Sequence, residues 1–325
     1  MAASGGTLVV PALTSLTLGI VGKQQFPHQQ GRNQAFNHGG ILSAALLIGS
    51  GGAILGPQTA FWVLAGMTVA AIVAVATTPG TAWNGRRAHG WNEGEPDKDD
   101  HSHPVLAVLA NRRLMFVTIA LTLFALSNGS MLPLLGQKLV ATGHPALRWT
   151  AAYIIIAQLT MIPVALWAGS LADRRGRRHL LLLACVALVA RAVLSALVDN
   201  PYWLIGAEVL DGIGSGVLGV AVPVLVADLT WTSGRTQTAL GAVNALQGAG
   251  GALSGVTGGL LIRWLGWTGA FLALAVPVAV ALALAWWLEE TRDSEAGGAT
   301  VPDVSDRPGA DRDLGGAGRT RQALR

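Results

Sequence analysis

The sequence predicts an all-α membrane protein that crosses the bilayer about eight times and has one further partial helix at its N-terminus. Three observations carry this prediction. Hydrophobic residues make up 51% of the 325 residues and charged residues 12%, whereas a soluble domain carries about 25% charge. The mean hydropathy is +0.49. Only Arg191, Glu208 and Asp211 place a charge well inside a long apolar run, where an ionised side chain costs several kcal/mol.

Each predicted span is a continuous apolar run. A helix needs about 20 such residues to cross the hydrocarbon core. The runs are continuous rather than alternating, which favours helices over the strands of a barrel. A shorter ninth run, 7–22, resembles the tail end of a span. The eight full or nearly full runs are 39–56, 60–78, 114–135, 150–171, 180–198, 203–227, 239–262 and 268–288.

The basic residues indicate how the chain is oriented. The loops on one side carry nearly all Lys and Arg, and the other side holds only Lys138, Arg148 and Arg263. Because cytoplasmic loops are enriched in Lys and Arg, we expect a multi-pass protein of the plasma (inner) membrane with a cytoplasmic C-terminus. The topology accounts for the basic pI of 9.8, so no nucleic-acid partner is expected. The loops on the basic side are 23–38, 79–113, 172–179, 228–238 and 289–325.

Composition divides the chain into four parts. We expect a partial N-terminal helical bundle over 1–78 and a polar cytoplasmic linker over 79–113. A six-helix bundle is expected over 114–288. Residues 289–325 contain few large apolar side chains, which predicts a disordered cytoplasmic tail. His101 and His103 stand beside acidic residues in the linker. We interpret them as solvated linker, so no metal site is predicted.

One loop carries a family motif. Residues 169–178 read GSLADRRGRR and connect two predicted spans on the basic side. This segment resembles the G-x-L-a-D-r-x-G-r-r loop of the major facilitator superfamily. The resemblance implies that the loop is a conformational latch between inward-open and outward-open states. Asp228 lies at the inner end of run 203–227, and from this position we expect it to pair with the arginines of the loop. The matching residues are Gly169, Leu171, Asp173, Arg174, Gly176, Arg177 and Arg178.

The resemblance also implies twelve helices in two halves of six. Counting back from the linker makes 60–78, 39–56 and the partial 7–22 the sixth, fifth and fourth helices. The first three would then be absent, as expected for a misassigned gene start or a truncated chain. A short family member is the alternative.

The three intramembrane charges are candidates for function. Arg191 and Glu208 lie at nearly the same depth on either side of the turn at 199–202, because each helical residue rises 1.5 Å. A structural Arg191–Glu208 ion pair is therefore expected, with Glu208 also a cavity candidate. Asp211 is then the acid without an obvious partner. It shares a face with Glu208 and Ser215, and it either exchanges a proton during transport, binds a cationic substrate, or is a buried hydrogen-bonded acid.

Four intramembrane amides complete the candidate cavity. Asn128, Gln158, Asn244 and Gln247 lie inside predicted spans, and Asn244 and Gln247 share a helix face. Such amides contact substrate or hydrogen-bond neighbouring helices. The element Gly52-x-x-x-Gly56-Pro57 partly resembles the antiporter motif of the efflux branch of the family. Gly56 and Pro57 also fall at the end of the run, where a plain turn explains them.

These observations predict a secondary active transporter that moves a small organic molecule by alternating access, in a proton-coupled efflux mode. The expected partners are a small-molecule substrate, protons and the lipid bilayer. No cofactor and no enzymatic activity are expected, because no P-loop and no catalytic constellation occurs. The alternative is a truncated, non-transporting membrane protein or scaffold that needs a partner chain.

Overall fold

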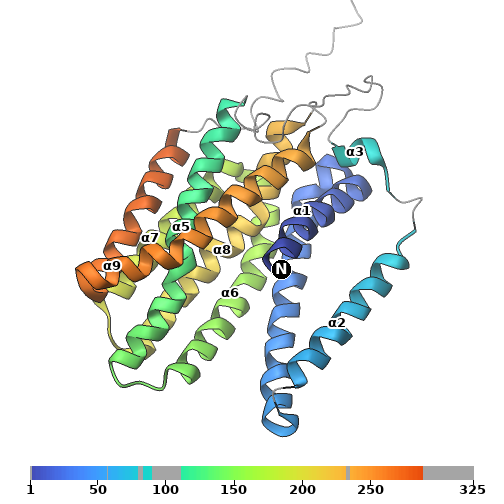
Figure 1. Ribbon diagram of the computed structural model, residues 1–325. Helices are drawn as coiled ribbons and strands as arrows, with labels where there is room; N and C mark the ends of the chain where they lie inside the picture. The colour runs from blue at the N-terminus through green and yellow to red at the C-terminus, as the bar shows by residue number, and fades with distance from the viewer. Residues whose placement is uncertain (1, 57, 80–82, 90–110, 232–234, 288–325) are drawn as a thin grey trace, which may run out of the picture. The chain divides into compact units, whose positions relative to one another are not determined.

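The computed structural model describes residues 2–56, 58–79, 83–89, 111–231 and 235–287, and the regular structure in these residues is helical (Figure 1). Six of the described helices are long and apolar enough to cross a membrane, which confirms the predicted all-α membrane fold. These six are α2 and α5 to α9. The helices are α1 (Ala2–Leu55), α2 (Thr59–Ala76), α3 (Gly85–His89), α5 (Arg112–Ala141), α6 (Ala146–Arg175), α7 (Arg177–Leu197), α8 (Pro201–Thr230) and α9 (Thr236–Trp287).

Two of these helices bend sharply at a glycine. Gly22 in α1 has φ 72° and Gly266 in α9 has φ 68°, a backbone region that side-chain-bearing residues rarely adopt. Each helix therefore consists of two arms, 2–21 and 23–55 in α1, and 236–265 and 267–287 in α9. Figure 1 shows the chain reversing direction at each bend.

The prediction of a loop over 23–38 is wrong, because this polar stretch lies inside the second arm of α1. Its polar side chains are partnered by protein groups. Asn33 Nδ2 donates to Thr17 Oγ1 at 2.8 Å, and Gln30 Nε2 donates to the Gly219 carbonyl at 3.4 Å. A hydropathy profile treats such a polar face as loop, although hydrogen bonding within the protein satisfies it.

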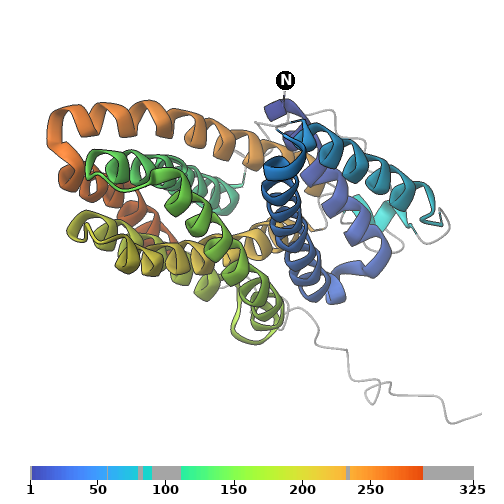
Figure 2. The same ribbon diagram turned by 90° about the horizontal axis from the view of Figure 1, so that it is seen from below.

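Helices α5 to α9 share one buried core. Helix α5 packs along α9, α6 along α8, and α7 against both α8 and α9 (Figure 2). Side chains such as Leu121, Met131, Leu188 and Phe271 are almost fully buried there. Asparagine side chains cap the first turns of α5 and α8. Asn111 Oδ1 accepts from the Leu114 amide at 3.2 Å at the start of α5.

A stripe of small residues brings α9 close to α5. Gly250, Ser254 and Gly258 recur every four residues and face α5. A Cβ atom at Gly250 would lie 2.5 Å from the Thr122 carbonyl oxygen, and one at Gly258 would lie 2.9 Å from Ser130. Small residues of this kind allow transmembrane helices to approach each other closely.

Gly250→Val is expected to lower the free energy of unfolding by about 1–3 kcal/mol, because the added side chain must push α9 away from the α5 backbone. The matched control is Gly255→Val in the same helix, where a Cβ meets nothing within 4 Å. Titration of the purified protein with SDS in mixed micelles measures both. Equal losses for the two variants would contradict the close packing.

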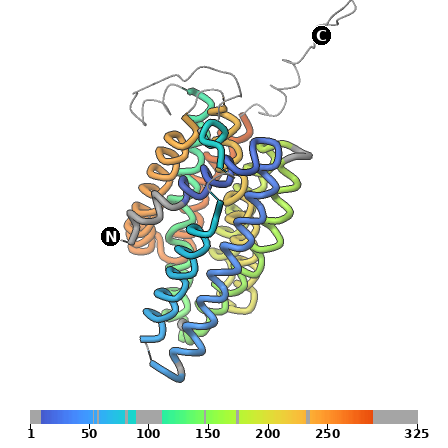
Figure 3. Tube along the Cα trace, turned by 90° about the vertical axis from the view of Figure 1, so that its right-hand side faces the viewer, coloured from blue at the N-terminus to red at the C-terminus, as the bar shows by residue number. Residues whose placement is uncertain are grey.

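Helix α1 joins α2 and α3 to this group. A Cβ at Gly31 would lie 2.7 Å from the Ala165 carbonyl oxygen of α6, and one at Gly169 would lie 2.8 Å from the Pro27 carbonyl oxygen. The second arm of α1 and α6 are therefore in backbone contact. Helix α2 runs beside that arm (Figure 3) and has only one buried residue, Thr59.

A buried lysine anchors the end of the helices where α7 meets α8. Lys138 on α5 is 4% exposed, and its Nζ donates to the carbonyls of Ser195 at 2.9 Å and Val198 at 2.8 Å. The same atom lies 2.9 Å from Asp199 Oδ1. The ammonium group thus satisfies carbonyls that the C-terminus of α7 leaves without helical partners.

Lys138→Met is expected to lower the free energy of unfolding by about 2–3 kcal/mol, because buried carbonyls lose a charged donor. Arg263→Met, at an exposed position, is the control and should change stability little. Thermal unfolding of the two purified variants gives the comparison. A Lys138→Met protein as stable as the control would show that the anchor contributes nothing.

Most of the predicted linker and the whole predicted tail lie outside the described residues, including His101 and His103. Within 79–113 the structure describes α3, which packs on the first arm of α1, and the start of α5 at Arg112. Among the described residues, no group of three or more His, Cys, Asp or Glu side chains could hold a metal ion.

Candidate functional site

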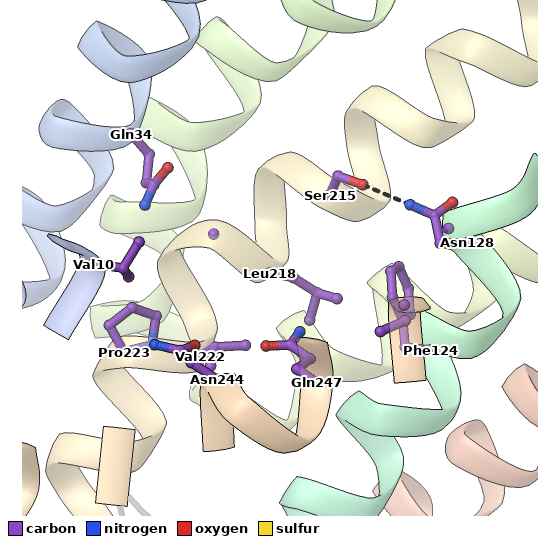
Figure 4. A pocket seen from close by; sticks show the side chains of 14 residues that line it. Val10, Gln34, Phe124, Asn128, Ser215, Leu218, Val222, Pro223, Asn244 and Gln247 are labelled. Atoms are coloured by element: carbon purple, nitrogen blue, oxygen red, sulfur yellow. Dashed lines mark hydrogen bonds between the residues drawn. The ribbon is translucent and has the colours of Figure 1, made fainter. Parts of the chain in front are cut away.

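A cavity of about 370 Å³ lies where α1, α5, α8 and α9 meet (Figure 4). Its size falls within the range of small-molecule sites, which is about 300–1,000 Å³. Both arms of α1 contribute a lining residue, Val10 and Gln34. The other lining residues are Phe124, Ala125, Asn128, Gly129, Ser215, Leu218, Gly219, Val222, Pro223, Asn244, Gln247 and Gly251.

The wall of this cavity is apolar with a few polar side chains, and each polar side chain among the described lining residues is an amide or a hydroxyl. The polar groups are Gln34, Asn128, Ser215, Asn244 and Gln247. Figure 4 shows Gln34 on one side of the opening and Asn244 and Gln247 on another. Lining of this kind, mainly apolar with a few oriented polar groups, is typical of ligand sites.

Proline 223 shapes the wall on α8. It has no backbone N–H, so the Gly219 carbonyl four residues earlier lacks its helical hydrogen bond. Gln30 Nε2 from α1 donates to this carbonyl at 3.4 Å. A Cβ at Gly219 would lie 3.2 Å from the side chain of Gln34. The second arm of α1 therefore contacts α8 directly at the cavity.

A buried cluster of charges stands behind this wall. Arg191 on α7 is 1% exposed and Glu208 on α8 is 0% exposed. Arg191 Nη2 donates to both oxygens of Glu208, at 3.0 and 3.2 Å. Arg191 Nη1 donates to Asp211 Oδ1 at 2.8 Å and also to Asn128 Oδ1. We refer to Arg191, Glu208 and Asp211 as the Arg191 cluster.

The expectation that Asp211 lacks a partner is wrong. A guanidinium group has five N–H donors in a planar fork, so Arg191 binds Glu208 through Nη2 and Asp211 through Nη1. The two carboxylates lie one helical turn apart on α8, which lets a single Arg191 reach both. With both acids ionised, the cluster carries one negative charge in excess.

Two side chains connect the Arg191 cluster to the cavity. Ser215 Oγ donates to Asp211 Oδ1 at 3.3 Å, and Asn128 Nδ2 donates to Ser215 Oγ at 3.4 Å (Figure 4). Asn128 and Ser215 both line the cavity. Asp211 is 13% exposed, whereas Glu208 is fully buried. Asp211 is thus the acid of the cluster that stands nearest to the cavity wall.

The predicted cavity residues occupy three different places. Asn128, Asn244 and Gln247 line the cavity, and Glu208 and Asp211 lie in the cluster behind it. Gln158 is not a lining residue, contrary to the expectation. Its Oε1 lies 2.8 Å from His38 Nδ1, because this face of α6 packs against α1.

The polar residues of α1 are the part of the site that the sequence argument missed. Gln30, Gln34 and His38 recur every four residues, so they lie on one helix face directed at α6 and α8. His38 is 8% exposed. The repeat of these polar residues every four positions within 23–38 was the available sign of a helix with a polar face.

The family-like motif at 169–178 is the junction of two helices. Helix α6 continues to Arg175, and Gly176 turns the chain into α7 with φ 86°. Gly169 lies against α1, and Leu171 packs on the core. Asp173 and Arg174 lie in the last turn of α6, and their side chains are outside the described set. The expectation of a loop over 172–179 is wrong, because a single glycine suffices for the turn.

Charged and aromatic side chains gather at this junction, and we call this end of the helices the basic end. Arg177 Nε lies 2.7 Å from Asp228 Oδ2, and Lys23 Nζ lies 5.1 Å from the ring centre of Trp231. Partial burial lowers the pKa of the Lys23 ammonium group, and the nearby Asp228 carboxylate opposes this effect. Arg178 Nη2 donates to the Trp286 carbonyl at 2.6 Å. These contacts connect α1, α7, α8 and α9.

The element from Gly52 to Gly56 ends α1 at a tight turn. Gly56 has φ 84°, and its carbonyl accepts from Thr59 Oγ1 at 2.9 Å as α2 begins. Pro57 lies outside the described residues. This geometry fits the plain turn that the sequence offered as the alternative interpretation.

Comparison with known proteins agrees with this architecture. The family model described as Major Facilitator Superfamily matches residues 1–230 and 143–308. An uncharacterized MFS-type transporter of Mycobacterium tuberculosis is 39% identical over 273 residues, covering 82% of this chain and 64% of the relative. The chain thus spans somewhat less than two thirds of that relative's length.

Two further matches are more distant. The tetracenomycin C resistance and export protein of Streptomyces glaucescens is 26% identical over 176 residues, which is 50% of this chain and 32% of that protein. The crystal structure of FucP, a Major Facilitator Superfamily transporter in the outward conformation, superposes with a TM-score of 0.62 at 14% identity, over 87% of this chain and 72% of FucP. The motif at 169–178, the helical fold and these matches together show that the chain belongs to the Major Facilitator Superfamily.

Proposed function

We propose that this chain acts in secondary active transport as a proton-coupled exporter of a small organic molecule, working by alternating access. The observation that carries the proposal is the position of Asp211. This carboxylate is bound to a buried arginine and joined through Ser215 to the wall of a ligand-sized cavity. A proton on Asp211 would change both contacts at once.

The coupling follows from the charge balance of the Arg191 cluster. Arg191 neutralises one carboxylate, so the ionised cluster keeps a second negative charge that a single proton on either acid would neutralise. Asp211 is the proposed proton carrier, since Glu208 is fully buried and holds Arg191 with both oxygens. A protonated Asp211 loses its charge attraction to Arg191 and becomes a weaker acceptor for both Arg191 Nη1 and Ser215 Oγ.

We propose that the motif at 169–178, together with Asp228, latches one state of the transporter. The Arg177–Asp228 ion pair joins α7 to α8, and the backbone contact of Gly31 with Gly169 joins α1 to α6. Movement of α1 relative to α6 must break the second contact. The distribution of Lys and Arg supports a cytoplasmic position of the basic end in the plasma membrane, with a cytoplasmic C-terminus.

Export rather than import is supported by two weaker observations. One relative is named as a resistance and export protein. The Gly52-x-x-x-Gly56-Pro57 element partly resembles the antiporter motif of efflux proteins. Both observations bear on the direction of transport, and the argument for proton coupling does not depend on them.

The experiment uses compounds that bind the purified chain in a thermal-shift screen. Each compound is added to everted membrane vesicles that contain the chain and hold an imposed proton gradient. A pH-sensitive dye such as ACMA reports proton movement. We expect these compounds to release protons from the vesicles and to be taken up. Compounds that bind without moving protons would contradict the proposal.

A second candidate is a scaffold that needs a partner chain. It is favoured by α2, where Phe61 and Trp62 are each 75% exposed and nearly all side chains lie outside the core. In a bilayer such a face meets either lipid or another helix. The scaffold predicts a stable complex with a second membrane protein after mild detergent extraction, and no proton movement with any bound compound.

A further inference from the structure

We propose that the cavity selects an uncharged molecule with an apolar body and one hydrogen-bonding edge of carbonyl, amide or hydroxyl groups. The inference rests on the proposed function, because it names the substrate class of the same site. It excludes organic cations and anions as the preferred ligands.

The first argument is the chemistry of the wall. Among the described lining residues none is charged, and the polar ones are four amides and one hydroxyl. Amides and hydroxyls offer both donors and acceptors but no full charge. A charged ligand would lose its hydration on entering the cavity and would meet no counter-charge among the described lining residues, which disfavours its binding. A neutral ligand with hydrogen-bonding groups pays no such penalty.

The second argument is that the nearest charges are already paired. Arg191 and Glu208 are almost fully buried behind Asn128, and Asp211 is bound to Arg191 and Ser215. To reach Asp211, a cationic ligand would have to displace Arg191, which also holds Glu208. The cluster therefore acts on the cavity through Asn128 and Ser215, whose exposed groups are neutral.

The third argument is an unsatisfied donor. Asn244 Nδ2 is buried and lacks a hydrogen-bond partner among the described residues. A buried amide donor without a partner costs free energy, and a rotation of this side chain toward the cavity would let an acceptor on a bound ligand recover it. Asn244 stands on α9 beside Gln247 and shares the cavity with Gln34 of α1 (Figure 4). A ligand carbonyl placed between the two helices could accept from both sides.

The fourth argument is the apolar part of the wall. Phe124, Leu218, Val222, Pro223 and Val10 supply most of the remaining side-chain surface. Burial of apolar surface is favourable, so an apolar ligand body contributes affinity that a small polyol would lack. The combined wall fits a neutral amphiphile.

The test compares three probes of equal shape and different charge, namely naphthamide, naphthamidine as a cation and naphthoate as an anion. Equilibrium dialysis against the purified chain in detergent at neutral pH measures binding. Subtracting the binding of Asn244→Leu removes partition into the micelle. We expect naphthamide to bind at least about tenfold more tightly than either charged probe, because a site built from amides rejects a ligand that leaves its groups unpaired.

Two further variants control the test. Asn37→Leu, at an exposed position on α1, should leave naphthamide binding unchanged. Gln34→Leu removes an amide from the opposite wall and should weaken it, which keeps the test decisive should Asn244→Leu fail to fold. Stronger or equal Asn244-dependent binding of a charged probe overturns the inference, and so does binding of all three probes that depends on neither amide.

The binding assay needs neither transport nor a proton gradient. Selective binding of naphthamide without proton movement in vesicles would contradict the proposed function and leave the substrate class standing. Proton-coupled movement of a cation, together with probe binding that does not depend on charge, would support the proposed function and contradict the inferred substrate class.

Discussion

Asp211→Asn is expected to abolish proton-coupled transport while the protein still folds and inserts. The amide can still accept from Arg191 Nη1 and from Ser215, so the contacts at 2.8 and 3.3 Å are preserved. It cannot take up or release a proton. Because a positioned proton acceptor contributes about 100-fold or more to proton-transfer reactions, we expect a loss of at least this size.

The measurement is dye-reported proton movement in everted vesicles, with a compound that the wild-type protein transports. Asp199→Asn is the matched control, since Asp199 lies at the α7–α8 turn and is 77% exposed. The control should transport at nearly the wild-type rate. Binding of the compound to purified Asp211→Asn should persist but no longer depend on pH. Transport at the wild-type rate by Asp211→Asn would rule out the coupling role.

Removal of Arg191 is expected to destabilise the protein far more than neutralisation of Glu208. Arg191→Met leaves the buried Glu208 and the partly buried Asp211 without their common partner, and breaking a buried pair in this way costs about 3–5 kcal/mol. Glu208→Gln leaves Arg191 paired with Asp211 and removes the excess negative charge. Its expected cost is about 1 kcal/mol, the value of one weakened hydrogen bond.

SDS titration of the purified variants measures this asymmetry. A double-mutant cycle with Arg191→Ala and Glu208→Ala adds an independent check. The double variant should lose less stability than the sum of the single losses, because the two side chains contact each other. Strictly additive losses, or a Glu208→Gln loss as large as that of Arg191→Met, would contradict the charge balance described above.

The sequence could predict those features that depend on local periodicity and helical rise. Long apolar runs predicted α5 to α9, and the constant rise per residue placed Arg191 and Glu208 at one depth, where the structure has them 3.0 Å apart. Depth alone does not specify how the helices are rotated about their axes. For that reason the sequence could not predict that Arg191 Nη1 contacts Asp211.

Rotation and packing also explain the other differences. Gln158 was a cavity candidate, yet the face of α6 that carries it packs against α1. The polar face of α1 over 23–38 was interpreted as loop because hydropathy does not tell a solvent-facing residue from one that hydrogen-bonds a neighbouring helix. The carbonyl released by Pro223 and its donor Gln30 are 189 residues apart, a pairing that only the tertiary fold brings about.

The charge balance of the Arg191 cluster has a consequence for the response to membrane voltage. With one arginine and two carboxylates, the cluster is negative when both acids are ionised and neutral when one is protonated. A charge that crosses the full membrane field gains about 2.3 kcal/mol per 100 mV. Suppose that access to the cluster alternates between the two sides of the membrane. The conformational change made with both acids ionised then depends on the membrane potential, and the change made with one acid protonated does not. The resting potential would then set the pace of one half of the transport cycle only.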